Sequence, residues 1–114
     1  KLGVSPNAVR AQFDLYVNSS KATKKAYPYI LELQNDLLSE IATRIVVPLA
    51  DYNSMKTEEF TKLTPKITYA GKELLILIPQ ITSISVNNLG QPIDRLAHFR
   101  DEILAALDFA ITGF

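Results

Sequence analysis

The spacing of apolar residues changes once along this 114-residue chain, and that change restricts the folds open to it. From residue 12 to about residue 86, apolar residues recur mostly at every second position, which is typical of β-strands with one buried face. From about residue 92 they recur every three or four residues, which indicates an amphipathic helix. The sequence therefore predicts a mainly β domain that ends in one helix.

Six segments carry the strand pattern, separated by polar or turn-forming residues. The predicted strands are 12–18, 27–34, 43–50, 66–70, 73–79 and 81–86. In the first of them, Phe13, Leu15 and Val17 alternate with other residues, so we expect a half-buried strand with these three facing the core. Residues 70–71 are predicted to form a hairpin turn, and Pro48 is predicted to mark an edge or a bulge.

The helix is predicted over about 92–111, and its apolar side chains should be buried. These are Leu96, Phe99, Ile103 and Leu107. Pro92 suits the first helical position, and Asp94 suits the positive end of the helix dipole. Gly113 suits the position just beyond the helix, where φ becomes positive.

Composition excludes several classes of protein. The chain has no cysteine, which removes disulfides and thiolate metal sites and fits a reducing compartment. Its 12 Lys and Arg balance its 12 Asp and Glu, unlike the basic surface of a typical nucleic-acid binder. No apolar run approaches the ~20 residues that a membrane span needs. We therefore expect a cytoplasmic protein without cofactor or metal, which contacts neither nucleic acid nor membrane.

Residues suited to catalysis are few and dispersed. His98 is the single histidine, and a surface or half-buried helix position explains it better than general-base catalysis. Arg44, Arg95 and Arg100, with acids nearby, give only a weak signal for acid–base chemistry on a phosphodiester. The lysines within 21–25 favour a solvated loop over a phosphate site. Because nucleotide-loop and H-E-x-x-H motifs do not occur either, we predict that the protein is not an enzyme.

Five short motifs, taken in order, are more specific than any one of them. They are QF-x-x-Y at 12–16, LQNDLL at 33–38, TRIVVPLA at 43–50, LTPKI at 63–67 and AALDFAITGF at 105–114. In this order and spacing the sequence resembles the CcdB family, toxins of toxin–antitoxin modules that poison DNA gyrase. The resemblance covers 12–114, which is expected to be a single toxin domain. Residues 1–11 are expected to be a leader that precedes the usual start of the family.

The resemblance implies a compact SH3-like barrel, mostly antiparallel, with a C-terminal helix, and it implies a homodimer. It also implies an action without catalysis, in which the dimer lodges between the two A subunits of gyrase and traps cleaved DNA. A neighbouring antitoxin, largely disordered in its C-terminal half, wraps the toxin and removes it from gyrase. Such modules are associated with plasmid maintenance.

The gyrase-contacting end of the family is typically Trp-Gly-Ile, which falls here on Thr112, Gly113 and Phe114. Gly113 matches, whereas Phe114 replaces an aliphatic residue with an aromatic one and Thr112 replaces the tryptophan. Tryptophan is a favoured interface anchor, so its loss is expected to cost about 2 kcal/mol or more of binding free energy. The resemblance implies four further gyrase-facing positions, which are Asp108, Ile111, Leu37 and Leu38.

Two alternative functions stay open. The exchange at Thr112 allows a degenerate member that binds an antitoxin but no longer poisons gyrase. A MazF-like endoribonuclease shares the barrel, but it needs a basic and polar catalytic cluster, which zero net charge and one helical histidine disfavour. The chain end poses a local choice as well, between a glycine cap that packs on the core and an apolar tip that binds a partner. The resemblance favours the tip as an interface.

Overall fold

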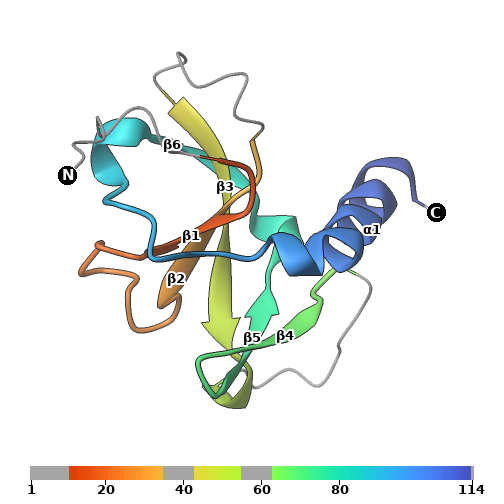
Figure 1. Cartoon of the computed structure of the whole chain (residues 1–114), viewed down its shortest axis with the longest axis horizontal. Coiled ribbons are helices and arrows are strands. Elements are labelled where there is room, and N and C mark those ends of the chain that lie inside the picture. Colours follow the sequence, from red (N-terminus) through yellow and green to blue (C-terminus); the bar gives the residue numbers. More distant parts are fainter. Residues whose placement is uncertain (1–10, 35–42, 55–62, 114) are drawn as a thin grey trace.

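The computed structural model describes residues 11–34, 43–54 and 63–113, which form a curled antiparallel sheet and a C-terminal helix (Figure 1). The strands described are β1 Asp14–Val17, β2 Tyr29–Glu32, β3 Thr43–Asp51, β4 Lys66–Tyr69, β5 Lys72–Ile76, β6 Thr82–Ser85 and β7 Asp94–Arg95. The α-helix is α1, Arg100–Thr112. Short 3-10 turns are Tyr52–Ser54, Ile78–Gln80, Val86–Asn88 and Ala97–Phe99. The predicted fold class is confirmed, although most of the predicted strands are too long at one or both ends.

The nine-residue strand β3 is the centre of the sheet, whose order is β4-β5-β3-β2-β1-β7 with β6 also paired to β3. One side of β3 pairs with β2. The other side pairs with β6 along its first half and with β5 along its last residues. Pro48 lies between these two partners, and its carbonyl accepts a hydrogen bond from Leu77 N at 3.0 Å. The prediction of an edge or bulge at Pro48 was therefore wrong, because the missing N–H falls where no ladder bond is needed.

The hairpin between β4 and β5 is confirmed. Tyr69 pairs with Lys72, so two residues make the turn. Ala70 has φ of +52° and Gly71 has φ of +78°. Two successive positive φ angles are what a type I′ turn requires, and this turn matches the twist of antiparallel strands.

The main core lies between the sheet and α1, and a smaller apolar cluster lies on the opposite face. Alternate residues of β1, β2 and β3, including Leu15, Leu31 and Val47, pack with buried Ile103 of α1. On the other face, Tyr16 and Val46 pack with Leu89. The first strand is therefore buried on both faces and not on one, because the segment that carries Leu89 folds over its second face. The prediction for Val17 was also wrong, since its side chain is 45% exposed.

The helix begins eight residues later than predicted, at Arg100 and not at residue 92. The chain before it runs extended, with Ile93 N bonded to Leu15 O at 2.7 Å and Leu96 N bonded to Phe13 O at 2.8 Å. Pro92 is thus not a helical residue, and Asp94 lies in β7. Asp101 and Glu102 occupy the first turn of the helix instead. The predicted apolar stripe does contact the core, with Leu96 and Ile103 buried and Phe99 and Leu107 partly buried.

Candidate functional site

The last turn of α1 carries four of the seven residues predicted to contact gyrase, and it projects away from the sheet (Figure 1). Asp108, Ile111, Thr112 and Gly113 are all exposed. Ile111 is 79% exposed, which is the largest exposure among the big apolar side chains of the described residues. We call residues 108–113 the helix tip.

The glycine at the tip caps the helix as predicted. Gly113 has φ of +81°, and its N–H donates to the carbonyl of Phe109 at 2.9 Å. The Thr112 hydroxyl donates to the carbonyl of Asp108 at 2.6 Å, which occupies another carbonyl of the last turn. A Cβ placed on Gly113 would meet no atom within 4 Å, so the side chain of a substitution there would point into open space.

The cap does not bring the tip onto the core. Ile103 and Ala106 are fully buried, and Leu107 still packs against the core. From residue 110 to residue 113 every side chain is exposed. Gly113 therefore ends the helix, while Ile111 is left with its apolar surface in solvent. Phe114, Leu37 and Leu38 lie outside the described residues, so the structure does not place them beside the tip.

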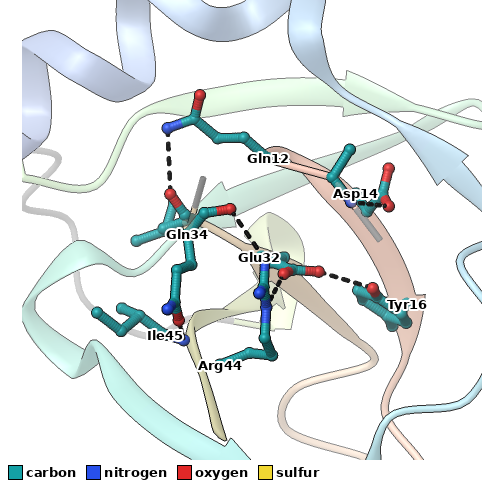
Figure 2. Close-up of polar contacts among 9 residues, drawn as sticks. Gln12, Asp14, Tyr16, Glu32, Gln34, Arg44 and Ile45 are labelled. Carbon is teal, nitrogen blue, oxygen red and sulfur yellow. Dashed lines mark hydrogen bonds and ion pairs between the residues drawn. The ribbon is translucent and has the colours of Figure 1, made fainter. Parts of the chain in front are cut away.

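The sequence analysis missed a buried polar network between β1, β2 and β3 (Figure 2). The Tyr16 hydroxyl donates to Glu32 Oε1 at 2.7 Å, and Arg44 Nε donates to Glu32 Oε2. The side chains of Glu32 and Arg44 are both 0% exposed. A charge withdrawn from water is tolerated when an opposite charge and hydrogen bonds compensate it, and this pair meets both conditions.

Burial raises the pKa of Glu32 above its ordinary value of 4.5, because removal from water disfavours the charged carboxylate. The hydrogen bond from Tyr16 and the positive charge of Arg44 act in the opposite direction, but burial outweighs them. The carboxylate is therefore held in a site that stabilises it less well than water does.

The network continues into the ends of the two strands that flank residues 35–42. Gln34 Oε1 accepts from Ile45 N at 2.8 Å, and the Gln34 carbonyl accepts from Arg44 Nη2 at 3.3 Å. Gln12 Nε2 donates to the carbonyl of Leu33 at 3.1 Å (Figure 2). Together these bonds fix the points at which the chain leaves β2 and enters β3.

A signal for this network was present in three motifs that mark the resemblance. Gln12 and Tyr16 belong to QF-x-x-Y, Gln34 belongs to LQNDLL, and Arg44 belongs to TRIVVPLA. The alternation pattern predicts a solvent-facing position for polar residues between apolar ones, as at Glu32. It fails here because the second face of the sheet is also covered near Glu32, where Tyr16 and Val46, the residue paired with Glu32, pack with Leu89.

Two of the other candidates for chemistry are held in ion pairs. Arg44 belongs to the buried pair, and Arg95 Nε lies 3.2 Å from Asp14 Oδ1, where it links β7 to β1. His98 is exposed, and its ring centre lies 4.3 Å from that of Phe99. Among residues 11–34, 43–54 and 63–113, no group of three or more His, Asp or Glu is placed to hold a metal ion. None of the helices described is long and apolar enough to span a bilayer.

The fold and the tip define a small antiparallel β protein whose C-terminal helix ends in an exposed apolar turn. The family model described as "CcdB protein" matches residues 12–113, and the chain therefore belongs to the CcdB family. This membership supports a function of the gyrase-poison type within toxin–antitoxin systems. No curated protein sequence matches the chain.

Proposed function

We propose that this protein is the toxin of a type II toxin–antitoxin system, that it binds the A subunit of DNA gyrase, and that it traps the enzyme on cleaved DNA. It acts by binding and not by catalysis. The observation that carries this proposal is the helix tip, where Gly113 caps the helix end and Ile111 is nevertheless 79% exposed. Ile111 exposes far more of its side chain than the next most exposed large apolar residue of the described part, Ile93 at 46%, and this surface is open to a partner.

The chemistry of the tip suits a protein contact. Ile111 supplies apolar area, and Gly113 supplies a short stretch without a side chain, which allows a partner's backbone to come close. The Thr112 hydroxyl already bonds to the helix, so burying Thr112 against gyrase does not leave that hydrogen unbonded. The site residues proposed for gyrase are Asp108, Ile111, Thr112, Gly113, Phe114, Leu37 and Leu38.

Two partners complete the proposal. A homodimer carries two copies of the tip, and a two-fold dimer can meet the two A subunits of gyrase with equivalent contacts. A cognate antitoxin with a disordered C-terminal half neutralises the toxin, since a segment that folds on binding can cover a large surface.

A second candidate function rests on one residue. Thr112 stands where the family typically has tryptophan, and threonine offers far less area to an interface than tryptophan does. This favours a degenerate member that binds its antitoxin but does not trap gyrase.

One assay separates these functions from the ribonuclease alternative. The purified protein is incubated with gyrase, supercoiled plasmid and ATP, and separately with RNA. We expect linear plasmid DNA after detergent and protease treatment, only when gyrase is present, and intact RNA. Antitoxin binding with no linear DNA at any toxin concentration would establish the degenerate member, and cleaved RNA would establish the ribonuclease.

A further inference from the structure

Residues 11–14 form a strained turn at the entry to β1. Asp14 N donates to the carbonyl of Ala11 at 3.1 Å, which closes the turn, and Phe13 is its third residue. Phe13 is buried and has φ of +70°, an angle at which glycine is the usual residue of a turn. Such strain persists when the surrounding structure compensates it, and strained residues cluster at sites that matter for function.

The positive φ lets Phe13 connect two neighbouring elements. In a regular antiparallel pair, the N–H and the C=O of one residue bond to the same partner. At Phe13 the N–H donates to the carbonyl of Glu32 in β2 at 2.7 Å, whereas the C=O accepts from Leu96 N, just beyond β7, at 2.8 Å. The turn therefore joins β2 to the chain that leads into α1.

The carboxylate of Asp14 uses its two oxygens to hold the turn and β7 together. Its side chain is only 4% exposed. Oδ2 accepts from the backbone N of Ala11 at 2.7 Å, and Oδ1 accepts from Arg95 Nε at 3.2 Å. Arg95 pairs with Asp14 across β7 and β1 and directly precedes Leu96. One side chain thus stabilises the strained turn and fixes the residue before Leu96.

These contacts lie at the base of the helix whose other end is the tip. Leu96 precedes the 3-10 turn Ala97–Phe99, which continues directly into α1 (Figure 1). Burial of Ile103 and Ala106 holds the middle of α1 against the core. With its middle held, a shift of the base tilts α1 and displaces the tip. A gap of about 0.5–1 Å already loses a quarter to a half of a van der Waals contact, so an interface at the tip is sensitive to this displacement.

We propose that Asp14 is a positioning residue for the helix tip, and that it acts through Arg95 and through the carbonyl of Phe13. Asp14 and Arg95 lie at the end of α1 opposite the tip, so they influence gyrase binding without contacting gyrase. Their effect on gyrase rests on the proposed function, whereas their effect on the direction of α1 does not.

The direction of α1 is measured as a distance between two spin labels. The chain has no cysteine, so Ala110→Cys at the tip and Lys72→Cys on β5, both at exposed residues, supply the only two labelling sites. Double electron–electron resonance on the full chain should give one narrow distance distribution. Asp14→Asn and Arg95→Gln should shift or broaden it, whereas Arg95→Lys should not, because its ammonium group still pairs with Asp14. An unchanged distribution in Arg95→Gln overturns the proposal, even if Asp14→Asn does not fold.

Gyrase affinity is measured on the unlabelled proteins by surface plasmon resonance with the immobilised A subunit. Arg95→Gln should weaken binding about 10-fold or more while the protein stays folded, and Arg95→Lys should bind as the wild type does. Glu73→Gln is the matched control, because it breaks another exposed ion pair, with Lys66 at 3.8 Å, that joins β4 to β5. It should leave both the distance distribution and the affinity unchanged. Equal losses of affinity in Arg95→Gln and Glu73→Gln would overturn the proposal.

Two combined results separate this inference from the proposed function. A shifted distance distribution in Arg95→Gln, together with a wild-type protein that never binds gyrase, would contradict the proposed function alone. A shifted distribution in Arg95→Gln with wild-type gyrase affinity would show that the direction of α1 does not govern gyrase binding, and would overturn the positioning role.

Discussion

The buried polar network and the helix tip use their side chains in opposite ways. In the network, Glu32 and Arg44 are fully buried and bonded to each other, and their role is to hold three strands together. At the tip, Ile111 is 79% exposed, and the Thr112 hydroxyl and the Gly113 N–H donate to carbonyls of the helix itself. Changes in the network should therefore remove stability and activity together, whereas changes at the tip should remove activity alone.

Breaking the network at Arg44 should have the largest effect. Arg44→Met leaves Glu32 buried without its ion-pair partner, which is expected to cost about 3–5 kcal/mol in the free energy of unfolding. Urea denaturation followed by circular dichroism measures this. The double variant Glu32→Leu with Arg44→Met should recover most of the loss, because no buried charge is left unpaired. A loss below about 1 kcal/mol for Arg44→Met would show that the pair is unimportant for the fold.

Removing one hydrogen bond to the same carboxylate should have a smaller effect. Tyr16→Phe keeps the ring in the apolar cluster but deletes the hydroxyl that donates to Glu32 at 2.7 Å. We expect a loss of about 1.5–3 kcal/mol, the range for hydrogen bonds to charged groups. Tyr52→Phe is the control, because Tyr52 is only partly buried and lies in the 3-10 turn that follows β3, outside this network. Equal losses in the two variants would contradict a special role for the network.

Placing a tryptophan at the helix tip should change gyrase affinity and leave the stability of the protein unchanged. Thr112→Trp should strengthen binding to the gyrase A subunit by about 2 kcal/mol, or roughly 30-fold in Kd. The unfolding free energy should not rise, because residue 112 is exposed. Surface plasmon resonance with the immobilised A subunit of gyrase measures the first quantity and urea denaturation the second. A more stable protein with unchanged gyrase affinity would favour a tip that packs on its own fold.

Ionisation of Glu32 should make the free energy of unfolding depend on pH. Because its folded pKa lies above its ordinary value of 4.5, the folded state keeps the proton at a pH where the unfolded chain has released it. The contribution of this group to stability is then greatest below about pH 4.5 and falls as pH rises through the folded pKa. The wild type should lose stability relative to Glu32→Gln over that interval. A difference between the two proteins that rises with pH would mean that Arg44 outweighs burial.

The sequence predicts the order of elements well and their surroundings less well. The hairpin at residues 70–71 and the cap at Gly113 follow from local backbone chemistry, so both could be predicted. The burial of Glu32 could not, because it depends on which segments cover the second face of the sheet. The late start of α1 is also a tertiary effect, since pairing with β1 holds residues 93–95 extended where local signals favour a helix.

In the candidate site, too, local features could be predicted from the sequence and long-range contacts could not. Asp108, Ile111, Thr112 and Gly113 come together because one helical turn joins them, and sequence spacing is enough to predict that. Any contact of the tip with Leu37 or Leu38 is long-range, and neither residue lies in the described part of the chain. Their place in the site stays a prediction.

The most direct test of the central claim is whether the Gly113→Glu variant still traps gyrase on cleaved DNA. The new carboxylate lies in open space in the free protein, so the strained φ of +81° and the negative end of the helix dipole oppose it, at a cost of about 1–2 kcal/mol in the free energy of unfolding. At an interface with gyrase the same carboxylate would be buried and unpaired, which costs several kcal/mol. Ala105→Glu adds an identical carboxylate at an exposed position in the middle of α1 and serves as the control. We predict a folded Gly113→Glu protein that yields no linear plasmid and an Ala105→Glu protein that yields as much as the wild type. Wild-type trapping by a folded Gly113→Glu protein would contradict the claim that the helix tip binds gyrase.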